Sequence, residues 1–136
     1  MTKEKTLLLI PLAIISGLLL YTWTIVLFTD IEATWRHYVA LGLFATLTFS
    51  YFKSFTMTVL ATGIYLILGT CNLFTLTPSV TTNSYGLRIG SLELWTPTFQ
   101  FLSFAILLLF FVLNFGTLIN IRLDYSEARQ AKKNKK

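Results

Sequence analysis

Residues 97–121 read PTFQFLSFAILLLFFVLNFGTLINI, a stretch without a charged side chain. A helix crosses the hydrocarbon core of a bilayer with about 20 predominantly apolar residues. This stretch is long enough, and it lacks the polar face that a helix on the surface of a soluble domain needs. We therefore predict a membrane span here, with Thr96 as its N-cap and Pro97 at its first helical position.

A second stretch of the same kind runs from Thr6 to Thr29. It resembles a secretory signal, but the apolar part of a signal has roughly 7–15 residues, and no small-residue cleavage site follows. Hydrophobic residues make up 54% of the 136-residue chain and charged residues 12%, about half the usual charged share of a soluble domain. Residues 6–29 are therefore predicted to be the first span of a single integral membrane domain.

The region between these stretches, Tyr38 to Pro78, is apolar except for Lys53. As one helix it would be roughly 60 Å long, twice the thickness of the hydrocarbon core. It must turn back, and Lys53-Ser54 is the polar point near its middle. Thr29 and Glu32 fit a capping box, which starts the earlier of these two helices at residue 30 or 31.

These boundaries predict an all-α membrane protein, a four-transmembrane-helix bundle with spans 6–29, 31–52, 54–77 and 97–121. The lysines and arginines lie at the N-terminus, at Lys53 and in the C-terminal tail, whereas the opposite side has only Arg36 and Arg88. The positive-inside rule then places both termini in the cytoplasm. We expect the membrane to be the cytoplasmic (inner) membrane of a bacterium.

The tail, residues 122–136, supplies most of the net charge of +5. Anionic lipid headgroups attract basic segments that lie next to a membrane span. No aromatic residue is interleaved with the last basic residues for base stacking, so we expect no nucleic-acid partner. The residues predicted to contact headgroups are Arg129, Lys132, Lys133, Lys135 and Lys136.

The loop before the last span has a β-strand pattern over residues 85–95. Apolar residues alternate on both sides of Gly90-Ser91, a dipeptide that suits a two-residue type II′ turn. With this turn, Leu87 pairs with Leu94, and Arg88 pairs with Glu93 on the other face. We therefore predict a small external β-hairpin between the third and fourth helices, with one apolar face.

An isolated hairpin is only marginally stable in water, so its apolar face needs a cover. One interpretation is a lid packed on the outer mouth of the bundle, and the alternative is recognition of a partner. The candidate partner-binding residues are Tyr85, Leu87, Arg88, Ile89, Leu92, Glu93, Leu94 and Trp95.

The predicted spans contain polar residues but no deep Asp, Glu, Lys or Arg. An ionisable residue inside the membrane usually marks a transport or proton pathway, so this pattern argues against a proton-coupled exporter or a channel with a charged ring. Two interpretations of the polar residues stay open: close helix packing, or an uncharged polar passage. The residues concerned are Asn72, Gln100, Ser103, Asn114 and Thr117.

His37 is the single histidine and Cys71 the single cysteine. His37 and Asp30 could form an acid–base pair at the outer surface, but no nucleophile, second metal ligand or phosphate-binding loop accompanies them. A free cysteine inside an apolar run usually behaves as a small hydrophobe. We therefore expect no catalytic residue, no metal and no cofactor.

The sequence thus predicts a small non-catalytic membrane protein: an accessory subunit, an assembly or stabilising factor, or a protective binding protein for a membrane partner. The alternative is a small oligomeric transporter or channel with an uncharged polar pathway. A second alternative is a membrane-surface enzyme that uses His37. The expected partners are the lipid bilayer and either a membrane protein or further copies of this chain.

Overall fold

The computed structural model describes residues 3–79, 86–89, 92–95 and 100–133, with side chains over 4–79 and 100–131. Tyr85, the Thr96-Pro97 helix start, Lys135 and Lys136 lie outside the described residues. The elements in chain order are α1 (Lys3–Phe28), α2 (Trp35–Lys53), α3 (Phe55–Thr70), β1 (Gly86–Ile89), β2 (Leu92–Trp95) and α4 (Phe101–Lys133).

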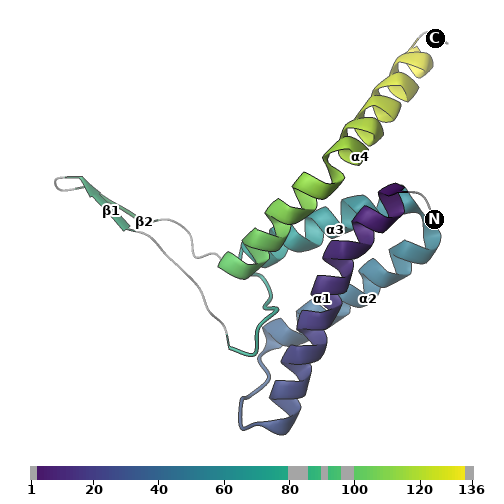
Figure 1. Ribbon diagram of the computed structural model, residues 1–136. Helices are drawn as coiled ribbons and strands as arrows, with labels where there is room; N and C mark the ends of the chain where they lie inside the picture. Colours follow the sequence, from purple (N-terminus) through teal and green to yellow (C-terminus); the bar gives the residue numbers. More distant parts are fainter. Residues whose placement is uncertain (1–2, 80–85, 90–91, 96–99, 134–136) are drawn as a thin grey trace.

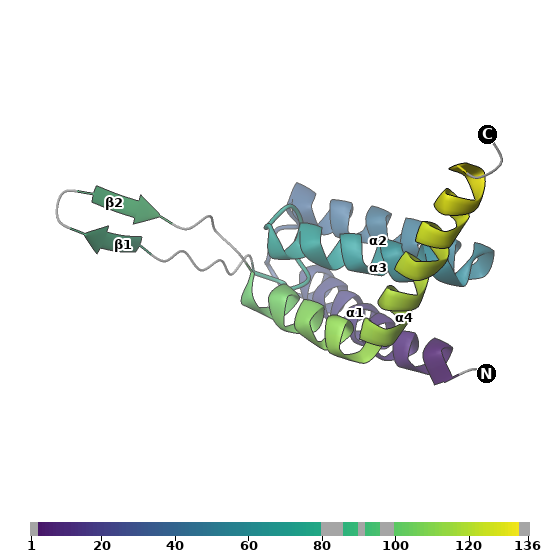
Figure 2. The same cartoon turned by 90° about the horizontal axis from the view of Figure 1, so that it is seen from above.

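The two longest helices, α1 and α4, run in opposite directions, so the start of α1 and the C-terminal part of α4 lie at one end of the helix bundle (Figure 1). α4 packs against α3 and α1, and α3 packs against α2. The turn between α2 and α3 lies at the same end as the termini in both views (Figures 1 and 2). We call this the basic end, because Lys5, Lys53 and Arg122 lie toward it.

The prediction of four membrane-spanning helices is wrong. Among the described residues, only α1 and α4 are both long and apolar enough to cross a bilayer. α3 is apolar but has 16 residues, a length of roughly 24 Å against a hydrocarbon core of about 30 Å. α2 has 19 residues, but Arg36, His37 and several hydroxyl side chains lower its hydropathy. The fold is a four-helix arrangement with two candidate spans.

α2 begins at Trp35, later than the sequence rules predict. The hydroxyl of Thr29, the predicted cap, instead donates to the Ile25 carbonyl oxygen of α1 at 2.6 Å. The capping box forms between Thr34 and His37, whose ring Nδ1 accepts from the Thr34 backbone N–H at 3.1 Å. Both threonines are followed three positions later by a polar side chain, and the one whose partner is buried, His37, forms the cap.

The turn between α2 and α3 lies at Lys53-Ser54, as predicted. Ser54 is extended (φ −161°, ψ 131°) and caps the end of α2 as well as the start of α3. Its N–H donates to the Ser50 carbonyl oxygen and its own carbonyl oxygen accepts from the Thr58 N–H, both at 3.0 Å. One extended residue therefore reverses the chain while its backbone groups stay hydrogen-bonded.

The third predicted span, 54–77, is too long, because α3 ends at Thr70. Asn72 has a φ of 62°, the left-handed conformation that ends many helices. The Leu73 N–H donates to the Leu68 carbonyl oxygen at 3.1 Å, and the Asn72 N–H donates to that of Gly69 at 3.0 Å. This is a Schellman motif with asparagine in the position that glycine usually takes.

Residues 73–79, which we call the return segment, fold back against the helices instead of continuing α3. Phe74 and Thr75 are 0% exposed and Leu76 is 1% exposed. The Phe74 ring lies against Tyr65 of α3, with the ring centroids 4.5 Å apart. The hydrophobic core therefore contains an irregular segment among its helices.

The two strands pair antiparallel, and the partners are those that the alternation in the sequence predicts: Leu87 with Leu94 and Arg88 with Glu93. The predicted packing of this strand pair is wrong. It does not cover the bundle as a lid, because β1 and β2 lie away from the helices in both views (Figures 1 and 2). The fold-class prediction therefore fails in its number of spans, and of the two interpretations of the strand pair the lid is excluded.

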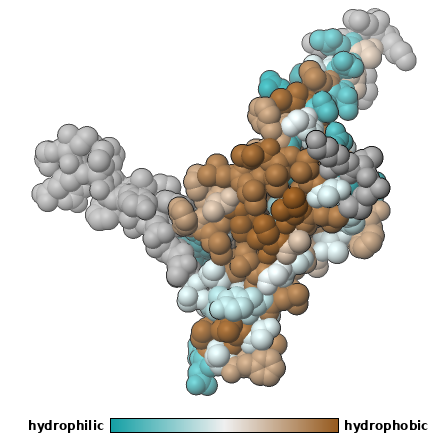
Figure 3. Space-filling model, in the orientation of Figure 1, coloured by the Kyte–Doolittle hydropathy of each residue, from teal (hydrophilic) through white to brown (hydrophobic). Residues whose placement is uncertain are grey.

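The outer surface of the helices is strongly apolar. Phe28 is 84% exposed, Phe52 82% and Val112 76%, and other large hydrophobic side chains on all four helices are exposed as well. Figure 3 shows apolar surface over the middle of the helices and polar surface along the C-terminal part of α4. Soluble monomers rarely expose apolar patches larger than a few hundred Å². This surface is typical of a protein with apolar surroundings.

Candidate functional site

The buried backbone of the return segment needs hydrogen-bond partners, because an unpaired carbonyl group away from water is costly. Side chains from three parts of the chain supply them. The hydroxyl of Thr22 donates to the Leu76 carbonyl oxygen at 2.7 Å. The amide of Gln100 donates to the Phe74 carbonyl oxygen at 2.6 Å. Together with His37, these are the anchor residues of the segment.

His37, the third anchor residue, is 1% exposed. Its Nδ1 accepts from the Thr34 backbone N–H, and its Nε2 lies 3.1 Å from the Thr77 carbonyl oxygen. A backbone N–H can only donate and a carbonyl can only accept, so in these two contacts Nδ1 is the acceptor and Nε2 the donor. The imidazole thus joins the start of α2 to the return segment.

This bonding differs from the acid–base pair that the sequence suggested for His37 and Asp30. Both ring nitrogens of His37 are occupied by backbone groups. Asp30 and Glu32 are exposed in the connection between α1 and α2. A general base must be within hydrogen-bond reach of the proton that it takes, and this imidazole has no free nitrogen. The geometry of His37 is that of a structural histidine.

Three residues of the predicted polar set come together at the end of the bundle opposite the basic end. The Gln100 amide donates to Asn72 Oδ1 at 3.0 Å, and the Ser103 hydroxyl donates to Gln100 Oε1 at 3.4 Å. Arg36 donates to the same Asn72 oxygen at 3.1 Å. Arg36 of α2 therefore contacts Asn72, just beyond the end of α3.

The other two polar residues, Asn114 and Thr117, lie elsewhere. They are buried on α4, and Asn114 is eleven positions beyond Ser103, which is roughly 16 Å along a helix. The Asn114 amide donates to the Phe110 carbonyl oxygen of its own helix at 3.1 Å. Its Oδ1 has no hydrogen-bond partner among the described residues. The five polar residues thus form two separate groups and not one continuous line.

Cys71 is exposed at the end of α3, although an apolar run surrounds it in the sequence. It caps the helix through its backbone, with its N–H donating to the Ile67 carbonyl oxygen at 2.9 Å. Among the residues that the structure describes, no group of three or more His, Cys, Asp or Glu side chains could hold a metal ion.

The predicted basic tail is helical up to Lys133, as a continuation of α4. Arg129 is exposed on it. Good helix formers such as Glu127, Ala128 and Gln130 extend the helix beyond its apolar part. Of the predicted headgroup residues, Arg129 is the one whose side chain the structure describes.

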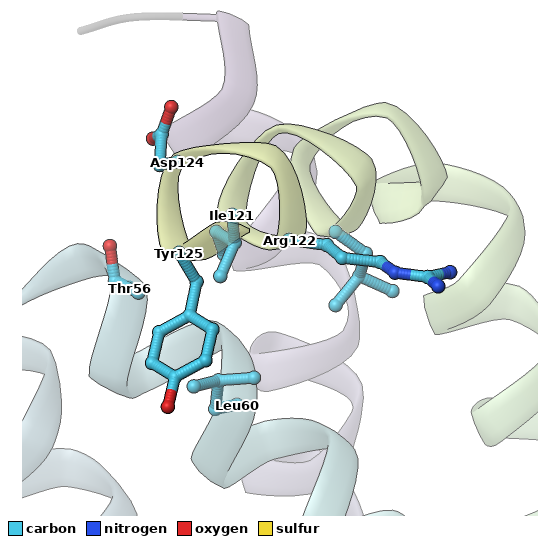
Figure 4. A pocket seen from close by; sticks show the side chains of 7 residues that line it. Thr56, Leu60, Ile121, Arg122, Asp124 and Tyr125 are labelled. Carbon is cyan, nitrogen blue, oxygen red and sulfur yellow. The ribbon is translucent and has the colours of Figure 1, made fainter. Parts of the chain in front are cut away.

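A groove lies between α3 and α4 at the basic end, with a volume of about 560 Å³. Its floor is apolar, formed by Leu60 of α3 with Leu118 and Ile121 of α4. Thr56, Arg122, Asp124 and Tyr125 form its rim (Figure 4). Figure 4 shows Tyr125 directed toward Leu60, whereas Asp124 points away from the floor.

Sequence reasoning missed the anchor residue Thr22, the capping role of His37 and this groove. The sequence did contain a signal for the return segment that Thr22 anchors. Asn72 is a helix-stop residue, and Pro78 cannot continue a helix. Together they indicate that residues 73–77 leave the helix and need external hydrogen-bond donors. Comparison of the chain with protein-family models, curated proteins and solved structures finds no match, so its function has to be argued from its own residues.

Proposed function

We propose that this protein is a non-catalytic membrane protein that acts as an accessory or stabilising subunit for a membrane partner. α1 and α4 would anchor it in the bilayer, with the α2–α3 pair packed against them. The partner would be held through the strand pair β1–β2. The membrane in question is the cytoplasmic membrane of a bacterium, with both termini on the cytoplasmic side.

The membrane location is supported by the exposure of the two candidate spans. A core helix of a soluble protein is mostly buried, whereas only 22% and 33% of the residues in the apolar windows of α1 and α4 are buried. α1 also packs against α4 and α3, as a helix retained in the mature protein does. The basic end matches the cytoplasmic side, because it combines both termini with Lys53 and Arg122.

The observation that carries the partner role is the position of the strand pair. β1 and β2 pair with each other but lie away from the helices (Figure 2). Independent stability needs three or more strands or packing against a helix, whereas an isolated two-stranded hairpin is marginal. The sequence pattern gives the strand pair one apolar face, with the Leu87–Leu94 pair at its centre. This face has to be packed against something, and the helices do not contact it (Figure 2). A partner protein would supply this contact.

The experiment is an affinity purification in mild detergent from native membranes, followed by mass spectrometry. Wild-type protein should retain one larger membrane protein in stoichiometric amount. The double substitution Leu87→Asp with Leu94→Asp should abolish retention, because it puts two charges on the contact face. The matched control is Arg88→Gln with Glu93→Gln, which changes the neighbouring cross-strand pair on the opposite face and should retain the partner.

Retention of the partner by the Leu87/Leu94 variant would refute the role of the strand pair. Recovery of this chain only as a homo-oligomer would refute the accessory role and favour the transporter. Both variants must remain in the pellet after alkaline carbonate extraction, which shows that they are still membrane-embedded.

A further inference from the structure

The groove at the basic end combines an apolar floor with a cation that lacks an internal counterion. Arg122 is the first charged residue after the uncharged stretch of α4. It is exposed at the rim of the groove, and no ion pair joins it to another described residue. The guanidinium is permanently charged and its planar fork fits a phosphate, so Arg122 is available to an anionic group from outside the chain.

The helix geometry explains why these residues share one side. Leu118, Ile121, Arg122 and Tyr125 follow the three- and four-residue spacing of one side of a helix, and they line the groove together with Thr56 and Leu60 of α3. Asp124 is two positions from Arg122, so the two side chains point in different directions from the helix. Figure 4 shows this separation. The carboxylate therefore does not neutralise the guanidinium.

We infer that this groove binds one anionic glycerophospholipid. Its acyl chain would lie on Leu60, Leu118 and Ile121, and its phosphate would accept hydrogen bonds from the Arg122 guanidinium. A volume of about 560 Å³ is within the usual range of ligand pockets, about 300–1,000 Å³. This inference rests on the membrane location proposed above.

Charge complementarity selects an anionic lipid over a zwitterionic one. The basic end also carries Lys5 and Lys53, and the C-terminal part of α4 continues with Arg129. An excess of positive charge at the cytoplasmic surface attracts anionic lipids. A guanidinium fork fits two phosphate oxygens and adds geometric selectivity to this attraction.

The test is native mass spectrometry of the full chain released from detergent micelles that contain phosphatidylglycerol or, separately, phosphatidylcholine. Wild-type protein should retain one phosphatidylglycerol and little phosphatidylcholine. Arg122→Gln should weaken retention of phosphatidylglycerol at least about fivefold, the factor that corresponds to loss of one basic contact near a membrane surface. Arg129→Gln removes the same charge from the same helix outside the groove and should change retention less than twofold.

A second variant tests the apolar half of the site. Ile121→Trp fills the floor without a change of charge and should also weaken phosphatidylglycerol retention. Equal losses in Arg122→Gln and Arg129→Gln would overturn the inference, because they would show diffuse attraction. Equal retention of both lipids, or unchanged retention in Arg122→Gln, would overturn it as well. If carbonate extraction releases the wild-type protein, the membrane location itself fails; if only the lipid results fail, that location stands.

Discussion

Substitution of Gln100 by leucine tests the anchoring of the return segment. Gln100 is 3% exposed, and its amide nitrogen donates to the Phe74 carbonyl oxygen at 2.6 Å and to Asn72 Oδ1 at 3.0 Å. Leucine has a similar volume, so the packing stays nearly constant while both hydrogen bonds are lost. The Phe74 carbonyl, in a residue that is 0% exposed, is left without this donor.

The expected cost follows from these two bonds. A buried polar group left unpaired costs about 1–3 kcal/mol. Hydrogen bonds between helices in a membrane contribute about 0.6 kcal/mol on average and up to about 1.7 kcal/mol. We therefore predict that Gln100→Leu lowers the free energy of unfolding by about 1–3 kcal/mol.

The assay is reversible unfolding in mixed micelles with increasing SDS, followed by far-UV circular dichroism. The control is Gln130→Leu, the same substitution at an exposed position on the polar part of α4. It should change the free energy of unfolding by less than about 0.5 kcal/mol. If Gln100→Leu also stays within about 0.5 kcal/mol of wild type, the return segment is not held by this amide and the account of the anchor residues is wrong.

Three further predictions use the same unfolding assay. Gly69→Ala should destabilise the protein by about 1–3 kcal/mol, since an added Cβ would lie 3.1 Å from Phe74 Cζ. Gly17→Ala, whose Cβ meets nothing within 4 Å, should instead stabilise α1 by about 0.5–1 kcal/mol. Equal effects of the two substitutions would contradict the packing of Phe74 against Gly69. Asn72→Ala should be less stable than Asn72→Gly by about 1 kcal/mol, because glycine adopts the φ of 62° without strain; the reverse order would exclude the left-handed helix end. Thr22→Val should cost about 1–2 kcal/mol through loss of its bond to the return segment, and an unchanged midpoint would exclude that bond.

Local chemistry made some features predictable. Lys53-Ser54 is the polar point of a long apolar region, and a turn there is required by helix length alone. The pairing of β1 with β2 follows from three local features: a glycine turn, the alternating leucines, and the Arg88–Glu93 pair. Each of these depends on residues close together in the sequence, so no tertiary information is needed.

The return segment could not be predicted in the same way. Residues 73–77 are as apolar as the helix before them, and hydropathy does not distinguish a helix from a buried irregular segment. Its irregular backbone persists because Thr22, His37 and Gln100 donate hydrogen bonds to it from distant positions. The third predicted span was wrong for this reason, since the apolar count included the segment in it.

The groove was hidden for a related reason. Thr56 and Leu60 of α3 meet Ile121 and Tyr125 of α4 only after the chain has folded. Arg122 alone indicated the cytoplasmic end of a span, and nothing in the sequence placed an apolar floor beside it. Long-range packing therefore carries most of the information about candidate sites in this chain.

Cysteine accessibility tests the central claim of a membrane location, because α4 as a span must place residues 79 and 126 on opposite sides of the membrane. Cys71 is first replaced by alanine, and single cysteines are introduced at Ser79 and Ser126, both exposed at opposite ends of the helices. In intact cells stripped of any outer barrier, a membrane-impermeant maleimide should label Ser79→Cys at once and Ser126→Cys only after the membrane is permeabilised. Labelling of both positions from the same side would contradict the account.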